Sequence, residues 1–132
     1  LNNSQFIKLI KIPLYRNNIF KAYKISKRID DDISAVCASF NLNIKNNIIK
    51  SVSIAYGGMA AIPKRALLCE TSLLNKELSE KNIHLAQQSL EDDFNPIDDM
   101  RASSKYRMKV AKNLLIKCFQ EIKNKKLIRI NA

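Results

Sequence analysis

Apolar and polar positions alternate in two consecutive segments of the first half of the chain. In residues 33–44 every second side chain on one face is apolar, which is typical of a strand buried mainly on one side. That face carries Val36, Ala38, Phe40, Leu42 and Ile44. After the asparagine pair at 46–47, residues 48–56 return with apolar side chains in phase and end at the glycines 57–58. The two segments are predicted to form a β-hairpin.

Apolar positions in the second half follow the spacing of helices. Ser79 is a candidate N-cap for one helix, which the Asn95-Pro96 step closes. Its apolar face carries Ile83, Ala86, Gln87, Leu90 and Phe94. Asp98 or Asp99 is expected to cap a longer final helix, whose core stripe is predicted from its spacing. The stripe consists of Tyr106, Val110, Ala111, Leu114, Leu115, Cys118, Phe119 and Ile122.

Two other segments have weaker patterns. Residues 6–12 are rich in β-branched residues and lysines and end at Pro13, so they are predicted to be a short edge strand followed by a loop. Pro63 favours a short helix through Leu74, although residues 64–68 are also compatible with a further strand. Strands followed by helices indicate an α+β fold, with a small antiparallel sheet of three to four strands packed against about three helices.

The composition is that of one globular domain. The 132 residues are 46% hydrophobic with two glycines, so we treat 1–132 as a single domain with its own core. The three cysteines are far apart and lie in apolar patterns, which favours buried thiols in a reducing cytoplasm over disulfides. The longest uncharged stretches, residues 33–44 and 51–63, are too short to span a membrane. Leucine at position 1 suggests a fragment of a longer protein.

Positive charge is concentrated in the first half of the chain. The net charge is +11, and residues 1–66 account for +8 of it with 11 basic and 3 acidic residues. Within them, residues 15–28 combine lysines and arginines with aromatic side chains and contain no acid. Such a run suits a nucleic-acid strand, and it suits equally an aromatic cofactor that carries a pyrophosphate. Composition does not separate these two partners.

Other candidate chemistry is less favoured than a structural interpretation. His84 is the only histidine, and no nucleophile elbow accompanies it, so a catalytic triad has no basis. The three aspartates at 30–32 lack the spaced partners of a cation loop, and we interpret them as neutralising Lys27 and Arg28. The glycines 57–58 lack the phosphate-loop pattern and indicate a tight turn.

Three separated motifs nevertheless resemble one known family. They are YKISKRIDDDISAV at 23–36, IAYGGMA at 54–60 with PKRA at 63–66, and DMRASSKYR at 99–107. In this order they are similar to the C-terminal subdomain of the FAD-binding unit in xanthine dehydrogenases and carbon monoxide dehydrogenase flavoproteins. The resemblance covers about residues 12–119 and is greatest to the bacterial xanthine dehydrogenase small subunit.

The resemblance implies a role in electron transfer within a molybdenum hydroxylase. In that family, purine is oxidised at a molybdopterin centre, electrons cross two [2Fe-2S] clusters, and FAD passes them to NAD. The partners it implies are a preceding FAD subdomain, iron–sulfur domains and a molybdopterin-binding subunit, with neither nucleic acid nor membrane. A carbon monoxide or aldehyde-type flavoprotein subunit is the alternative, and a basic nucleic-acid-binding module is the alternative from another class.

The resemblance also implies a set of cofactor-binding residues. Lys24 matches the family lysine that lies against the flavin, while Arg28 and Asp31 fall on the loop that lines the isoalloxazine and nicotinamide side. The chain departs from the whole family unit because it has no glycine-rich phosphate-binding turns of the preceding subdomain, which make most FAD contacts. We therefore expect the isolated chain to be inactive, and we interpret the motifs at 56–59 and 99–107 as architectural.

Overall fold

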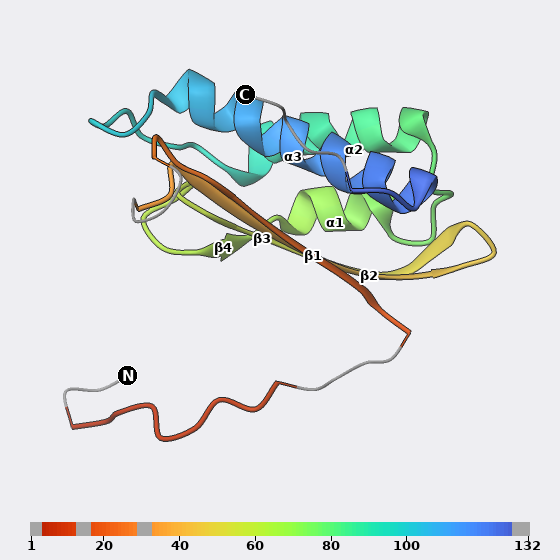
Figure 1. Ribbon diagram of the computed structural model, residues 1–132, viewed down its shortest axis with the longest axis horizontal. Coiled ribbons are helices and arrows are strands. Elements are labelled where there is room, and N and C mark those ends of the chain that lie inside the picture. The colour runs from red at the N-terminus through yellow and green to blue at the C-terminus, as the bar shows by residue number, and fades with distance from the viewer. Residues whose placement is uncertain (1–3, 13–16, 29–32, 128–132) are drawn as a thin grey trace.

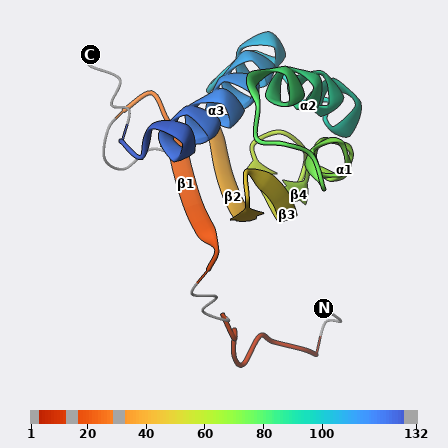
Figure 2. The same cartoon turned by 90° about the vertical axis from the view of Figure 1, so that its right-hand side faces the viewer.

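A computed structural model describes residues 4–12, 17–28 and 33–127 of the chain. The elements in chain order are β1 (Ile19–Ile25), β2 (Val36–Lys45), β3 (Ile48–Gly57), β4 (Lys64–Arg65), α1 (Leu67–Leu73), α2 (Glu80–Asp93) and α3 (Ser104–Asn124). The strands form one antiparallel sheet in the order β1-β2-β3-β4. All three helices lie on the same face of this sheet (Figures 1 and 2). The predicted α+β architecture is therefore confirmed.

The β2–β3 hairpin forms as its alternation predicts, with one irregularity. Asn46 and Asn47 both have positive φ angles, of 52° and 61°, which asparagine tolerates and the tight turn requires. Asn43 pairs with Ser51 while the next residue of β2 pairs with Ile49, so Lys50 is the extra residue of a β-bulge. Because the bulge changes the phase of β3, Ile49 is buried in place of Ile48.

The core lies between the sheet and the helices. Edge-to-face ring pairs run through it, from Tyr23 to Phe40, from Phe40 to Tyr56 and from Tyr56 to Phe94, with centroids 5.5 to 5.9 Å apart. Cys69 and Cys118 are buried, as predicted. From the helices, the core also receives Leu73, Ile83, Ala86, Leu90, Ala111, Leu114, Leu115 and Phe119.

Two expectations about the first 28 residues are wrong. Residues 5–12 form no strand, and the apolar side chains among them are exposed, from Ile7 at 64% to Phe6 at 81%. Figure 1 shows this segment running away from the sheet. Instead, the edge strand is β1, within the segment interpreted as a basic loop. Lys21 occupies an inward position of β1 beside Tyr23 and hides the strand alternation in the sequence.

The helix starts are partly as expected. Ser79 caps α2 by accepting the Asn82 N–H, and α2 ends at the residue before Phe94. For α3 the N-cap residue is Ser103, whose hydroxyl accepts the Tyr106 N–H at 3.2 Å, and not Asp98 or Asp99. Asp98 still contributes to the helix start, because its Oδ1 accepts the N–H of Ser104 at 2.7 Å. Both interpretations of the segment after Pro63 are confirmed, because the short strand β4 is followed, after one residue, by the helix α1.

Within the described part of the chain, no helix is sufficiently long and apolar to cross a membrane.

Candidate functional site

The sheet face that the helices leave uncovered carries mostly small side chains. Across the three long strands, Ala22 is paired with Ser39 and Ser39 with Ala55, and in the next row Lys24 is paired with Cys37 and Cys37 with Gly57. We call this surface the open face. It comprises the outward side chains of Phe20, Ala22, Lys24, Cys37, Ser39, Asn41, Ser53 and Ala55, together with Gly57. Lys24 is therefore a cation whose cross-strand neighbours are small, and the one large apolar side chain in this set is Phe20, which is 66% exposed.

Cys37 lies on the open face and is exposed, which corrects the prediction that all three cysteines are buried. It occupies the outward phase of β2, between the buried Val36 and Ala38. The alternation of β2 places Cys37 on this face, opposite Val36 and Ala38. The apolar residues around a cysteine in the sequence do not show on which face of the strand its thiol lies. Burial raises the pKa of the Cys69 and Cys118 thiols to about 12, so both remain protonated at neutral pH.

This difference predicts selective thiol chemistry. In the native chain we expect an aromatic disulfide reagent to modify Cys37 alone, because the thiolate is the reactive form and the reagent must reach it. Counting released thiolate before and after unfolding measures this, with one thiol expected in the native state and three in denaturant. The Cys37→Ser variant should release none before unfolding. A second thiol that reacts as fast in the native chain would contradict the burial of Cys69 and Cys118.

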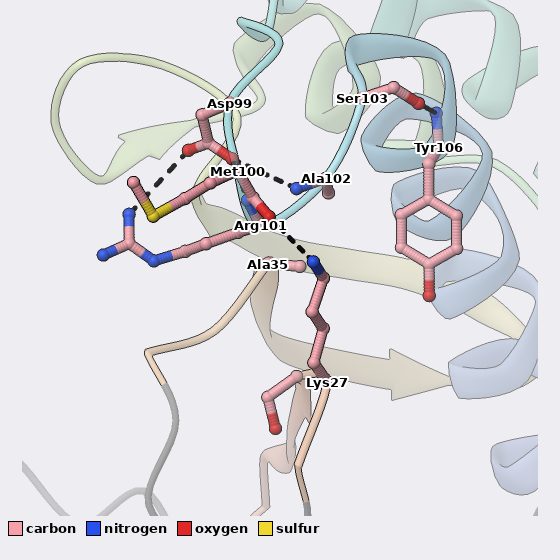
Figure 3. Close-up of a pocket in the computed structure, with 9 residues that line it drawn as sticks. Lys27, Ala35, Asp99, Met100, Arg101, Ala102, Ser103 and Tyr106 are labelled. Carbon is pink, nitrogen blue, oxygen red and sulfur yellow. Dashed lines mark hydrogen bonds and ion pairs between the residues drawn. The ribbon is translucent and has the colours of Figure 1, made fainter.

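A cleft of about 470 Å³ lies at the end of β1. One wall consists of Ser26 and Lys27, which follow β1, and the other is the α2–α3 connection with Met100 and Arg101 (Figure 3). The Lys27 ammonium donates to the Met100 carbonyl at 2.7 Å and joins the two walls. Tyr106 of α3 also lines the cleft and is 48% exposed.

Asp99 shapes the far wall of this cleft. Its Oδ1 accepts the N–H groups of Arg101 at 2.8 Å and Ala102 at 3.1 Å, and the Arg107 guanidinium at 2.6 Å. The backbone N–H groups of Ala102 and Arg101, together with Arg107, hold the pKa of the Asp99 carboxyl below its ordinary value. Asp99 therefore acts as an anionic turn residue, a role the sequence prediction of a helix cap did not include.

Arg107 is a functional candidate, although its motif at 99–107 predicted only an architectural role. It is 3% exposed in the first turn of α3 and donates to carbonyl oxygens of the Ala35 and Gly58 residues. A signal for this burial exists in the sequence, since position 107 lies four residues before Ala111 and seven before Leu114 on the core stripe. A cation at a core position requires buried partners.

The three residues implied by the resemblance are placed as follows. Lys24 stands on the open face, and Arg28 is exposed three residues beyond the end of β1, with its carbonyl accepting the Ser26 hydroxyl. The structure thus brings both residues to the same end of β1. Asp31 lies outside the described residues. Among those described, no group of three or more histidine, cysteine, aspartate or glutamate side chains is arranged to hold a metal ion.

Comparison with known proteins identifies relatives across this fold. The glyceraldehyde dehydrogenase medium chain of Sulfolobus acidocaldarius is 28% identical over 121 residues, covering 92% of this chain and 43% of the relative. The xanthine dehydrogenase of Emericella nidulans is 34% identical over 93 residues, covering 67% of this chain and 7% of the relative. The chain thus spans less than half the length of these relatives.

A solved structure has the same fold. A chain of the Cu,Mo-CO dehydrogenase in its cyanide-inactivated form superposes with a TM-score of 0.74 at 21% identity, covering 83% of this chain and 38% of that one. The family described as the CO dehydrogenase flavoprotein C-terminal domain matches residues 21–122, which include most of β1 and nearly all of α3. The chain therefore belongs to the CO dehydrogenase flavoprotein C-terminal domain family.

Proposed function

We propose that this chain is the C-terminal part of the FAD-binding unit of a xanthine dehydrogenase. In this role it helps pass electrons from iron–sulfur clusters through FAD to NAD during the oxidation of hypoxanthine or xanthine. The observation that carries the proposal is the open face, on which Lys24 stands among small side chains in a domain of a flavoprotein family. When bound, the flavin supplies the exchange of electron pairs and single electrons.

The open face fits a planar aromatic ring. None of Ala22, Ser39 and Ala55 extends far above the backbone, and Gly57 has no side chain at all, so a ring can approach the strands closely. The Lys24 ammonium then provides positive charge where a reduced ring carries negative charge. We assign Arg28 and Asp31 to the nicotinamide side of the same site.

The proposed residues do not select the substrate that is oxidised. Oxidation takes place in another part of a molybdenum hydroxylase, so an aldehyde or carbon monoxide dehydrogenase would use this domain in the same way. The similarity over 92% of the chain to a glyceraldehyde dehydrogenase medium chain favours this alternative as a second candidate. Reduction of the flavin in the whole enzyme by xanthine, glyceraldehyde or CO in turn will distinguish the three, and we expect xanthine to reduce it.

The nucleic-acid alternative receives less support from the arrangement of the basic segment. Tyr23 faces the core, and the Lys21 ammonium lies 3.2 Å from Glu121 on the helix side of the sheet. An aromatic ring buried in this way cannot stack on a base. Among the described residues of the segment, the cations Lys24, Lys27 and Arg28 and one ring, Phe20, are exposed. So few cations support only weak binding that salt abolishes.

Protection of Cys37 tests the position of the flavin directly. In the whole flavoprotein unit, bound FAD is expected to slow alkylation of Cys37 at least about tenfold, because a ring on the open face covers the thiol beside Lys24. The apoprotein is the reference, and Cys37→Ser identifies the modified site. Stoichiometric FAD with an unchanged alkylation rate would place the ring elsewhere and overturn the assignment of Lys24.

A further inference from the structure

Three segments that are distant in the sequence meet at the Arg107 guanidinium. Its Nη1 donates to the carbonyl of Ala35, just before β2, and at 3.0 Å to the carbonyl of Gly58, just after β3. Its Nη2 donates to Asp99 at 2.6 Å, and its Nε to the Ala102 carbonyl at 3.4 Å. These partners come from the three motifs that carry the family resemblance. One buried side chain therefore connects all of them.

Gly58 provides the space in which these groups meet. Its φ angle is +80°, in the left-handed region that favours glycine. A Cβ atom at this position would lie 2.3 Å from the Ala35 carbonyl oxygen and 3.0 Å from the Arg107 Nη1. Since the first of these distances is shorter than any real contact, a side chain here would displace Ala35 or Arg107. Glycine at position 58 is thus required by the approach of Arg107 to Ala35.

The contact with Ala35 extends to the end of β1. The Ala35 N–H donates to the Ile25 carbonyl at 2.8 Å, so the peptide groups on both sides of Ala35 are held, one by Arg107 and the other by β1. Lys27 is also held from the opposite wall of the cleft, because its ammonium donates to the Met100 carbonyl. Met100 follows Asp99, which pairs with Arg107. Arg107 therefore restrains both supports of Lys27, which lines the cleft (Figure 3) and immediately precedes Arg28 in the chain.

We propose that Arg107 is a positioning residue that fixes Arg28 at the end of β1 for the NAD-linked step. This inference rests on the proposed function, in which Arg28 stands on the nicotinamide side of the flavin. A displacement of about 1 Å in a group that orients a reactant can reduce a rate about a hundredfold. Arg107 meets the requirement for such a support, because it is buried, its planar group has several donors, and it is bonded to four residues from three segments at once.

The first readout does not require the cofactor. In the 132-residue chain, Arg107→Lys keeps a cation but cannot reach Ala35, Gly58 and Asp99 together. We expect it to raise amide hydrogen exchange at Ala35 and in the segment 26–28 while leaving α2 unchanged. Arg65→Lys, the same change at a half-exposed arginine of β4, is the matched control and should leave exchange at Ala35 at its wild-type rate. Equal acceleration throughout the chain would reduce Arg107 to a general stabilising residue.

The second readout is a double-mutant cycle in the whole enzyme. Arg107→Lys should lower NAD-linked kcat/KM about tenfold or more, with the rate to an artificial acceptor unchanged. In an Arg28→Ala background it should cause no further loss, because two residues that act through one group are not additive. Additive losses, or full NAD-linked activity of Arg28→Ala, would overturn the inference. Absence of NAD-linked turnover in the wild-type enzyme would instead refute the proposed function, with the exchange result still deciding the role of Arg107.

If Arg107→Lys does not fold, the milder variant Asp99→Asn tests the same inference. Asp99→Asn retains the guanidinium and its contacts with Ala35 and Gly58 but removes the charge that orients it. We expect the same pattern of exchange and the same non-additivity with Arg28→Ala, at a smaller magnitude. Wild-type exchange at Ala35 in Asp99→Asn, together with wild-type NAD kinetics, would contradict a role for the Asp99–Arg107 pair in positioning.

Discussion

Replacement of Glu121 by alanine is expected to lower the free energy of unfolding of the chain by about 3 to 5 kcal/mol, the usual cost of removing one partner from a buried ion pair. The Glu121 side chain is 1% exposed, and its Oε2 accepts the Tyr23 hydroxyl at 2.9 Å and lies 3.2 Å from the Lys21 ammonium. Its Oε1 lies 3.4 Å from Lys117, one helical turn away. Without the carboxylate, the groups that converge on it lose their common partner.

Tyr23 makes the loss of Glu121 especially costly. Burial raises the pKa of the Tyr23 phenol, so its hydroxyl remains a proton donor throughout the usual pH range and requires an acceptor. The ring is fixed by its edge-to-face contact with Phe40 and by the Lys117 ammonium 5.5 Å from its centroid. Because the ring cannot turn its hydroxyl to water without breaking these contacts, the donor would remain unsatisfied.

A second glutamate provides the control for this prediction. Glu80 pairs with Lys123 at 3.1 Å, but the two side chains are 72% and 57% exposed. Such a surface pair is worth less than about 1 kcal/mol, so Glu80→Ala should change stability little. Urea unfolding of both variants and of Glu121→Gln, which retains an acceptor for Tyr23, makes the comparison. A loss for Glu121→Ala no larger than that for Glu80→Ala would show that the buried carboxylate does not hold β1 to α3.

The sequence predicts those elements whose burial follows a simple period. Residues of β2 and β3 alternate, and α2 and α3 carry apolar stripes, because each packs one face against a shared core. The β1 strand is missed since its inward positions include Lys21, which is acceptable there only because Glu121 of α3 faces it. A pairing between residues 100 positions apart leaves no trace in local periodicity.

The opposite error at residues 6–12 has a related cause. The segment has the composition of a strand, yet a strand exists only where another backbone supplies hydrogen-bond partners. Among the described residues, the ladders join only β1 to β2, β2 to β3 and β3 to β4, and no strand pairs with residues 6–12. Composition thus shows that a segment favours an extended strand, and the position of the neighbouring strands decides whether that strand forms.

The residues of the candidate site are predicted from the resemblance to a known family more than from the pattern of polar and apolar positions. Lys24 and Arg28 are identified by motif, and the structure adds that the first stands on the open face and the second is exposed just beyond the end of β1. The importance of Arg107 depends on carbonyl groups of Ala35 and Gly58. Backbone acceptors carry no residue identity, so only coordinates show that the three motifs share one buried guanidinium.

Replacement of Lys24 by alanine in the whole enzyme is expected to lower the midpoint potential of the flavin and to slow NAD-linked turnover. On the proposed site, the Lys24 ammonium stabilises the reduced, anionic ring more than the oxidised ring, so its loss favours oxidised flavin. A charge-assisted contact is worth about 1.5 to 3 kcal/mol, which corresponds to about 30 to 65 mV for a two-electron couple. Oxidation of substrate with an artificial acceptor should continue at the wild-type rate.

Two further variants separate charge from packing and from a general change in net charge. Lys24→Met retains the apolar stem, so it should match alanine if charge is the cause and wild type if packing is the cause. Lys45→Ala removes the same charge from the hairpin end of β2, eight residues from Cys37, the partner of Lys24. At about 3.3 Å per residue, this position is roughly 26 Å away, beyond the screening length at physiological salt. The flavin potential of Lys45→Ala should therefore equal that of the wild type.

Flavin redox titration of the four proteins, beside steady-state rates with NAD and with the artificial acceptor, decides the role of Lys24. A lowered potential in Lys24→Ala and Lys24→Met, with Lys45→Ala unchanged, assigns the effect to the ammonium on the open face. Equal potentials and equal NAD rates in all four proteins would remove Lys24 from the flavin site. Because Lys24 faces away from the core and pairs across the sheet with exposed Cys37, its replacement should leave the thermal unfolding temperature nearly unchanged, so a shifted potential cannot be attributed to misfolding.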